Sequence, residues 1–448
     1  MEFAAAAKTE SMNSLRHRAL RSGSWTVIGH LSNQALRLGG NLILTRLLFP
    51  EAFGLMTIVQ TVIFGLKMLS DIGIEPSIIQ HSRGHEAAYA NTAWTIQVIQ
   101  GLLIWVLLCL IAPFAASFYS QPMLASLLPV VGLSAIIGGF ESTKLAQANR
   151  ALALKKRVLI EVAAYALGLV MTVFWAWIDR SIWSLVGGGL LGAAAKTAAS
   201  HFLLEGEGNR FAWEKDSVTA IFGFGQWIMF SSILGFLAGE GNKLLIASFL
   251  NVKMLAYFTL ASTMSLVFWQ LIQQVSSKVL FPAYSEVARE RPENLNSVAA
   301  RSRLFVIIPG WLVALFFVFR GDHFMQLLYD HRYAESGYLL QMLAMGTLVG
   351  VIGGSYSGLL WAKGLVRTST GILVVQVAVQ LLGMIAGYHF YGEKGVILSV
   401  AAAGWLLYPV QAYVHAKIGL WQPRVDFPFI LLSILIVALQ FSRIFEHA

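Results

Sequence analysis

The chain is poor in cysteine and in charge. Cys109 is its single cysteine, which excludes an intramolecular disulfide and a metal site built from several cysteines. Of the 448 residues, 12% are charged and 57% are hydrophobic, and the mean hydropathy is +0.67. A soluble domain carries about 25% charged residues. These values exclude an ordinary soluble domain and are typical of a polytopic membrane protein.

The motifs of common enzyme classes are also missing. The sequence contains no phosphate-binding glycine loop ending in Lys-Ser/Thr, no HExxH motif and no paired aspartates for a sugar nucleotide in an exposed loop. His81 and His85 have i, i+4 spacing, but no further metal ligand is evident beside them. We therefore expect no catalytic residue, no bound metal and no cofactor. Driving energy would come from a gradient of H⁺ or Na⁺, or from the substrate's own gradient.

A cleavable signal peptide is not evident either. Residues 1–20 are polar and basic, and no small-residue cleavage site follows a short apolar core. We expect this segment to be cytoplasmic and the first span to be an uncleaved anchor. The net charge of +9 is spread over segments between apolar runs, which indicates membrane orientation rather than binding of nucleic acid.

Apolar stretches long enough to cross a bilayer follow one another along the chain. A spanning helix needs about 20 mostly apolar residues. The sequence therefore predicts an all-α polytopic membrane protein with twelve transmembrane helices. They lie near 23–48, 52–74, 91–115, 124–146, 157–178, 182–204, 218–250, 254–277, 303–320, 337–362, 368–391 and 395–418. A thirteenth apolar run at 427–443 is either a short span or a surface helix, within a tail at 421–448.

Lysine and arginine are distributed unevenly between the two sides that these spans define. With the N-terminus in the cytoplasm, most of the 32 basic residues fall in cytoplasmic segments, above all 150–157 and 278–303. The 116–123 loop, placed outside, carries no charge. This is the positive-inside pattern. A thirteenth span would place the C-terminus outside.

The chain repeats itself weakly. Residues 41–49 parallel 242–250, and residues 145–154 parallel 359–368. Each half therefore reads as six spans. Because six is even, both halves enter from the cytoplasm, so they would form parallel repeats around a central cavity. The predicted domains are a first six-helix lobe at 21–204, a cytoplasmic linker at 205–217 and a second six-helix lobe at 218–420.

Two short polar segments interrupt corresponding spans of the halves. Residues 37–41 read RLGGN in the first span, and residues 238–242 read AGEGN in the seventh. A charge near the bilayer centre costs roughly 2.5–3.5 kcal/mol, and each glycine weakens a helix by roughly 1 kcal/mol. Matched glycine-interrupted spans in two halves point to the substrate site of a transporter.

Polar residues recur at helical spacing on the first two spans of each half. Residues that share one face of a hydrophobic span must meet other protein or water. The stripes therefore line a wet cavity or form buried hydrogen bonds between helices. They comprise His30, Asn33, Arg37 and Asn41; Gln60, Lys67 and Asp71; Gln226, Glu240 and Lys243; and Thr259, Thr263, Gln270 and Gln274.

Several of these charged residues could have a simpler role than lining a cavity. Lys67 and Asp71 are four residues apart, so on a helix they would pair with each other. Glu240 and Lys243 admit the same kind of pairing. Arg46 lies near the outer membrane edge, where its side chain can reach the interface.

Two other features also have simple explanations. Lys144 and Lys196 lie near the cytoplasmic ends of spans, where positive charge sets topology. Glycine at every fourth position from Gly346 to Gly358 forms a ridge that permits close helix packing. A surface for sliding during alternating access is the sharper alternative for this ridge.

Several longer runs carry a family resemblance. They are 44–55 (LTRLLFPEAFGL), 69–74 (LSDIGI), 255–261 (LAYFTLA), 279–285 (VLFPAYS) and 362–364 (AKG). Together they resemble the bacterial polysaccharide flippases, the O-antigen and exopolysaccharide group of the multidrug/oligosaccharidyl-lipid/polysaccharide exporter superfamily. The resemblance covers most of residues 20–420.

The resemblance implies a flippase of the bacterial inner membrane. Such proteins move undecaprenyl-diphosphate-linked oligosaccharides to the outer leaflet by alternating access, for lipopolysaccharide or exopolysaccharide biosynthesis. It also implies a cationic cavity, which Arg37, Arg46 and Lys67 match. In the second half Lys243 is the matching cation, and Glu240 departs from the pattern. A diphosphate carries about two negative charges, which arginine grips through forked hydrogen bonds.

These considerations assign the predicted site residues and partners. Intramembrane carboxylates often bind a proton or Na⁺, so two of them are candidates for coupling. The substrate-binding residues are Arg37, Asn41, Arg46, Lys67 and Lys243, and the coupling residues are Asp71 and Glu240. Expected partners are the lipid-linked oligosaccharide, membrane lipids, and the polysaccharide polymerase and glycosyltransferases of the same biosynthesis, with no nucleic acid.

Two other functions compete with the flippase. An ion-coupled multidrug exporter of the same superfamily would need an acidic, aromatic cavity, and the cations on the first two spans count against it. An integral-membrane polysaccharide polymerase or ligase would need an outer catalytic loop, and the outer loops are short. We therefore expect a transporter and no enzyme.

Overall fold

The helices of the chain divide into two units. The computed structural model describes residues 2–151, 153–238, 241–275 and 280–447. Its internal contacts separate Met1–Phe236 from Leu237–Ala448, here called unit 1 and unit 2. Within the described ranges every regular element is a helix, as expected for an all-α protein. The domain boundaries at 205–217 and 420 stay predictions.

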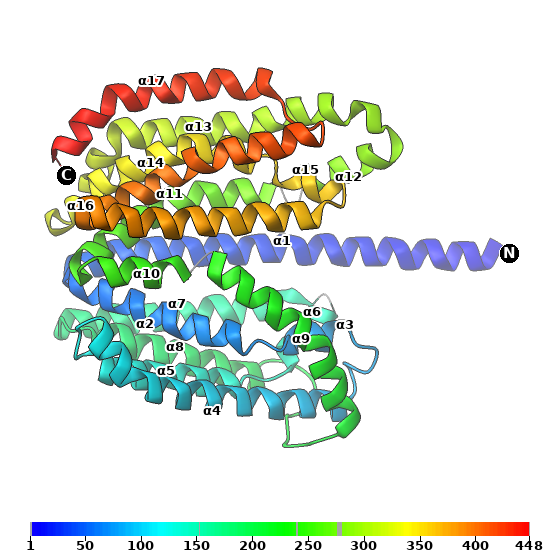
Figure 1. The fold of residues 1–448 in the computed structure, drawn as a ribbon. Coiled ribbons are helices and arrows are strands. Elements are labelled where there is room, and N and C mark those ends of the chain that lie inside the picture. Colours follow the sequence, from blue (N-terminus) through cyan, green and yellow to red (C-terminus); the bar gives the residue numbers. More distant parts are fainter. Residues whose placement is uncertain (1, 152, 239–240, 276–279, 448) are drawn as a thin grey trace. The chain divides into compact units, whose positions relative to one another are not determined.

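Unit 1 holds nine helices among its described residues, seen from blue to green in Figure 1. They are α1 (Glu2–Leu47), α2 (Pro50–Leu69), α3 (Ile74–Gln80), α4 (Ala87–Phe118), α5 (Leu124–Gly139), α6 (Lys144–Arg150), α7 (Leu154–Ile178), α8 (Trp183–Phe202) and α9 (Lys215–Ala238). Helices α5 and α6 are bent by 57° at a short break. Short helices α3 and α6 pack together at the end of the unit where α7 begins, here called the α3–α6 end.

Unit 2 holds eight helices among its described residues. It contains α10 (Gly241–Phe249), α11 (Val252–Val275), α12 (Phe281–Glu290), α13 (Leu295–Leu328), α14 (Glu335–Gly354), α15 (Ser357–Ala362), α16 (Val366–Lys417) and α17 (Pro423–His447). Short 3-10 turns lie at Pro292–Asn294 and His331–Tyr333. Helix α16 is two helices that meet at Gly392, whose φ of 60° is left-handed and therefore favours glycine.

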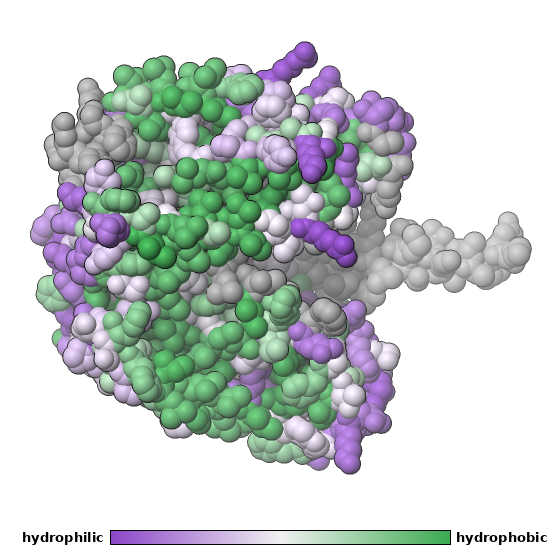
Figure 2. All heavy atoms as spheres, in the orientation of Figure 1, coloured by the Kyte–Doolittle hydropathy of each residue, from purple (hydrophilic) through white to green (hydrophobic). Residues whose placement is uncertain are grey.

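Several helices have the length and composition of membrane spans. In the part of the chain that the structure describes, seven helices qualify, or eight if the bent α5–α6 pair is one span. They are α2, α4, α7, α13, α14 continuing into α15, α16 and α17. Hydrophobic side chains cover the flanks of the helices in each unit, and hydrophilic ones gather toward their ends (Figure 2). The chain is a multi-pass membrane protein, while the count of twelve or thirteen spans stays a prediction.

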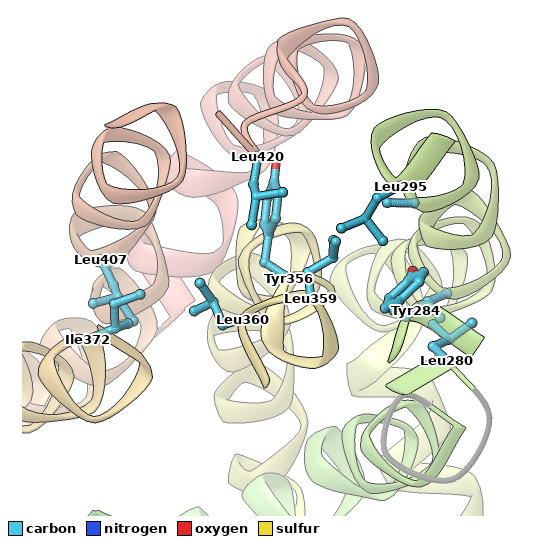
Figure 3. Close-up of a cluster of buried hydrophobic side chains, with 11 residues drawn as sticks. Leu280, Tyr284, Leu295, Tyr356, Leu359, Leu360, Ile372, Leu407 and Leu420 are labelled. Carbon is cyan, nitrogen blue, oxygen red and sulfur yellow. The ribbon is translucent and has the colours of Figure 1, made fainter. Parts of the chain in front are cut away.

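A buried apolar cluster holds the interrupted helices of unit 2 together (Figure 3). It gathers side chains from α12, α13, α15 and α16 around the break between α14 and α15. Its members are Leu280, Tyr284, Leu295, Ala299, Val306, Tyr356, Leu359, Leu360, Ile372, Leu407 and Leu420. In the predicted glycine ridge, Gly346 of α14 packs closely, because a Cβ atom there would lie 2.1 Å from the carbonyl oxygen of Ala401 on α16, whereas a Cβ atom on Gly350 would meet nothing within 4 Å.

Candidate functional site

The predicted cations of unit 1 lie on α1 and α2. Arg37 and Arg46 are exposed on α1, and Asn41 between them is half-buried. Lys67 is exposed near the end of α2. Arg37 interacts electrostatically with the hydroxyl of Tyr165 on α7. The charged neighbours of Lys67 are Glu141 at the α5–α6 break and Lys196 on α8.

Asp71 lies in the turn after α2 rather than on the helix. Its Oδ1 accepts a hydrogen bond of 2.9 Å from the backbone N–H of Gly73. Its Oδ2 accepts one of 2.9 Å from the hydroxyl of Ser232 on α9. Helix α2 ends at Leu69, so the i, i+4 geometry considered for Lys67 and Asp71 does not apply. Asp71 instead ties the end of α2 to α9.

The predicted residues of the second half are described only in part. Lys243 is half-buried on α10. Glu240 lies outside the described residues, as do the side chains of Gln270 and Gln274. The roles of Lys243 in substrate binding and of Glu240 in coupling stay predictions.

Unit 1 contains a charge cluster that the sequence patterns did not reveal. We call it the inner charge cluster; it comprises Lys67, Glu75, Glu141, Arg157, Glu161 and Lys196. Lys196 Nζ lies 2.9 Å from Glu141 Oε2, and Lys67 interacts electrostatically with both. Lys196 was expected to be a topology charge. The structure places it in a specific ion pair between α8 and the α5–α6 break.

The rest of the inner charge cluster lies at the start of α7. Arg157 binds Glu75 of α3 and also lies 3.0 Å from Glu161, one turn further on. Asn149 Nδ2 donates to Glu75 Oε1 at 3.1 Å. Burial of Glu75 opposes its ionisation, but the hydrogen bond and charge of Arg157 outweigh this effect, so the pKa of Glu75 is lowered. Glu75 therefore stays ionised at neutral pH.

The α5–α6 break holds Glu141 in place. Breaking a helix frees carbonyl oxygens that need donors. Gln97 Nε2 of α4 donates to the carbonyl oxygens of Gly138, Gly139 and Glu141 at 3.0–3.1 Å. The ring Nε2 of His201 on α8 lies 2.8 Å from the carbonyl oxygen of Phe140. The break is thus fixed from α4 and α8 and is not a loose turn.

Another polar network fastens the segment between α8 and α9. The backbone N–H groups of Arg210, Ala212 and Glu214 donate to side-chain oxygens of Asn91, Thr95 and Thr92 on α4, at 3.0–3.2 Å. Arg83 Nη2 lies 2.8 Å from Glu214 Oε1. We call these contacts the linker clamp. The hydrogen bond from Ser217, followed by that from Arg83, lowers the pKa of Glu214.

Unit 2 carries a fully buried ion pair. Arg303 Nη2 of α13 lies 2.7 Å from Asp426 Oδ1 of α17, and both side chains are 0% exposed. Asp426 Oδ2 accepts hydrogen bonds from the hydroxyls of Tyr356 at 2.7 Å and Tyr408 at 2.8 Å. The guanidinium of Arg303 also stacks 3.4 Å from the ring centroid of Tyr356. These contacts bind α17 to the α14–α15 break.

The two clusters differ in what they can do chemically. The Arg303–Asp426 pair is fully buried, and its carboxylate is already held by Arg303, Tyr356 and Tyr408. The pair therefore stabilises the fold. In the inner charge cluster Lys196 is 31% exposed and Glu141 is 23% exposed, and Lys67 is exposed. Ammonium groups that reach water can exchange a carboxylate for a phosphate oxygen. Within the described ranges no group of histidine, cysteine and acidic side chains is arranged to hold a metal ion.

Comparison of sequences points to one family. The profile of the family described as "Polysaccharide biosynthesis protein" matches residues 43–337, well over half of the chain. The lipopolysaccharide biosynthesis protein WzxC of Escherichia coli is 24% identical over 391 residues, which cover 86% of this chain and 78% of that protein. The succinoglycan biosynthesis transport protein ExoT of Rhizobium meliloti is 22% identical over 295 residues, covering 64% of this chain and 58% of that protein.

Comparison of structures points to one fold. An inward-facing multidrug resistance transporter of the MATE family, in the MOP superfamily, aligns with a TM-score of 0.67 at 12% identity, covering 86% of this chain and 94% of that one. The lipid II flippase MurJ in an inward closed conformation aligns with a TM-score of 0.66 at 14% identity, covering 93% and 92%. At these identities the likeness concerns the fold alone.

Proposed function

The chain belongs to the polysaccharide biosynthesis protein family, within the multidrug/oligosaccharidyl-lipid/polysaccharide exporter superfamily, and we propose that it is a flippase for lipid-diphosphate-linked oligosaccharides. The family resemblance predicted from the sequence is confirmed. The family is one of transporters, so the expectation that the chain is no enzyme is confirmed as well, and the polymerase alternative falls away.

The observation that carries the proposal is the set of exposed cations on α1, the predicted first span, and on α2, which has the length and composition of a membrane helix. Arg37 and Arg46 lie on α1, and Lys67 lies on α2. A cation facing hydrocarbon is costly, so such residues mark a path for an anion or water. A diphosphate supplies about two negative charges and many acceptor oxygens. A carrier for cationic drugs would have little use for these side chains.

The finer features of the proposal follow the sequence predictions. We place twelve or thirteen spans in two six-helix lobes around a central cavity, which opens alternately to the two sides of the bacterial inner membrane. The N-terminus and the α3–α6 end of unit 1 would face the cytoplasm. Asp71 and Glu240 are the proposed sites for a coupling proton or Na⁺. Polysaccharide polymerase and glycosyltransferases would act on either side of this step.

Transport in proteoliposomes tests the role of Arg37. With one defined lipid-diphosphate oligosaccharide, Arg37→Ala should reduce the translocation rate at least roughly tenfold, because a charge-assisted hydrogen bond contributes about 1.5–3 kcal/mol. Arg37→Lys should retain part of the rate. Arg180→Ala, an exposed arginine between α7 and α8, is the matched control. Equal rates for Arg37→Ala and this control would remove Arg37 from the substrate path.

A further inference from the structure

Helices α7 and α8 of unit 1 leave an open groove between them. Its volume is about 420 Å³. The lining consists of aliphatic side chains and one charged residue at one end. It comprises Lys156, Leu159, Ile160, Ala163, Ala164 and Leu167 from α7, Ala195 and Ala199 from α8, and Leu203 directly after α8.

The groove follows from the sequence of the two helices. The lining positions of α7 recur at intervals of three and four, so they form one face of the helix. Facing them, α8 presents Ala195 and Ala199, whose methyl groups are too small to fill the space. The sides stay open, since Leu159 is 49% exposed and Leu167 is 46% exposed. An apolar trough of this kind requires an apolar occupant.

The length of the groove matches one membrane leaflet. Lys156 and Leu167 are eleven residues apart on α7, which corresponds to about 16 Å at 1.5 Å per residue. Half of the hydrocarbon core of a bilayer is about 15 Å. A groove that begins at one membrane surface beside Lys156 would therefore end near the bilayer centre. A polyprenyl tail of 55 carbons is far longer than this, whereas an ordinary acyl chain fits it.

The charged end of the groove carries the residue types found at the level of lipid headgroups. Lys155 places its ammonium group 5.6 Å from the ring centroid of Trp25, and lysine and tryptophan are typical of the membrane interface. Lys156 pairs with Glu205 at 2.5 Å, but the two side chains are 56% and 91% exposed. Such exposed pairs contribute little to stability. Lys156 can therefore exchange Glu205 for a phosphate.

We propose that this groove binds one acyl chain of an anionic phospholipid, with the phosphate on Lys156. The lipid comes from the leaflet at the α3–α6 end of unit 1. The aliphatic lining takes the chain, and the lysine selects the charge of the headgroup. This proposal concerns a resident lipid, so it stands apart from the proposed transport of oligosaccharides.

Native mass spectrometry of the full chain tests the proposal, with dioleoyl phosphatidylglycerol and dioleoyl phosphatidylcholine as probes in mixed micelles. The wild type should retain phosphatidylglycerol in preference. Ala199→Trp, which fills the groove and so removes the burial of the acyl chain, should lower its retention roughly tenfold. Ala198→Trp is the matched control, since Ala198 is exposed on the same helix and does not line the groove. Lys156→Ala should abolish the preference between the two lipids, whereas Lys215→Ala, an exposed lysine of unit 1, should keep it.

Two results would overturn the proposal. One is equal retention of phosphatidylglycerol by Ala199→Trp and Ala198→Trp. The other is displacement of phosphatidylglycerol by equimolar undecaprenyl phosphate, which would assign the groove to the tail of the substrate instead. If Ala199→Trp does not elute as a folded monodisperse species, Ala199→Leu replaces it with the same expectation. Oligosaccharide transport is measured separately, so a failure there leaves this test unaffected.

Discussion

At the residue scale, the ion pair of Glu141 and Lys196 sets the electrostatic environment of Lys67. Lys67 is exposed on α2 and interacts electrostatically with both members of the pair. Glu141 thus lies close to two ammonium groups and moderates their repulsion. An arriving diphosphate would compete with Glu141 for these cations. The inner charge cluster therefore extends the proposed substrate path from α1 and α2 to α8.

Removing Glu141 should destabilise unit 1 and be partly reversed by a second change. Glu141→Gln leaves Lys196 and Lys67 without their shared anion, at a cost of about 1 kcal/mol for this partly exposed pair. Thermal unfolding in detergent should show a lower midpoint. Adding Lys196→Met should recover part of the loss, because the unpaired charge is gone.

The control for this cycle is an acidic residue outside the cluster. Glu207 is exposed between α8 and α9, so Glu207→Gln should leave the midpoint unchanged. Strictly additive effects of Glu141→Gln and Lys196→Met would show that the two residues are not coupled.

At the element scale, both units interrupt one helix in corresponding places. The α5–α6 break directly precedes residues 145–154, and the α14–α15 break directly precedes 359–368, which are the parallel runs of the sequence. The first break is secured by Gln97 and His201. At the second, Arg303 Nη2 donates to the carbonyl oxygen of Ile352 at 3.3 Å. Different side chains thus meet the same need for hydrogen-bond partners.

The linker clamp predicts a pH dependence in the segment between α8 and α9. The pKa of Glu214 in the folded chain is lowered from its ordinary value of 4.5. The contribution of ionised Glu214 to the clamp is therefore complete above pH 4.5 and is lost as pH falls through the lower folded value. Hydrogen exchange at the amides of Arg210 and Ala212, corrected for intrinsic rates, should speed up in that acidic window.

A neutral replacement should mimic the acid effect. Glu214→Gln should accelerate exchange at these amides several-fold at pH 7, because the ion pair with Arg83 is removed. Glu207→Gln in the same segment is the control and should exchange like the wild type. If Glu214→Gln also keeps the wild-type protection, the clamp owes its stability to the α4 side chains alone.

Element positions were largely predictable, and the charge pairs were not. Apolar length is a local property, so each predicted span falls, over its described residues, on one helix or on consecutive helices. The stripe of Arg37 and Asn41 likewise follows from helical periodicity. Partners far apart in sequence depend on packing, as with Lys196 and Glu141, which are 55 residues apart. Nothing local distinguishes Lys196 from a topology charge.

At the scale of the whole molecule, the end of the chain is an integral part of unit 2. Helix α17 packs against α13 and α14 and supplies the carboxylate of the buried ion pair. The sequence left open whether residues 427–443 span the membrane. They lie within α17, one of the helices with the length and composition of a span.

Neutralising Asp426 should therefore be severely destabilising. Asp426→Asn leaves Arg303 buried without an anion, and breaking a buried pair costs about 3–5 kcal/mol. A large fall in the thermal midpoint, with early protease cleavage of α17, is expected. Arg424→Ala, an exposed neighbour on α17, should behave like the wild type.

The double change Arg303→Met/Asp426→Leu separates charge from packing. Replacing both partners by apolar side chains removes the unpaired charge, so most of the lost stability should return. A double variant as unstable as Asp426→Asn would instead assign the defect to the lost hydrogen bonds of Tyr356 and Tyr408.

The Arg303–Asp426 pair also determines when unit 2 can complete its folding during synthesis. Arg303 precedes Asp426 by 123 residues, so at 5–20 residues per second it leaves the ribosome about 6–25 s earlier. During that interval the guanidinium is in the nascent chain before its carboxylate exists. Unit 2 can close only when α17 has been synthesised. A chain that ends between Arg303 and Asp426 therefore contains the arginine of this pair without its carboxylate.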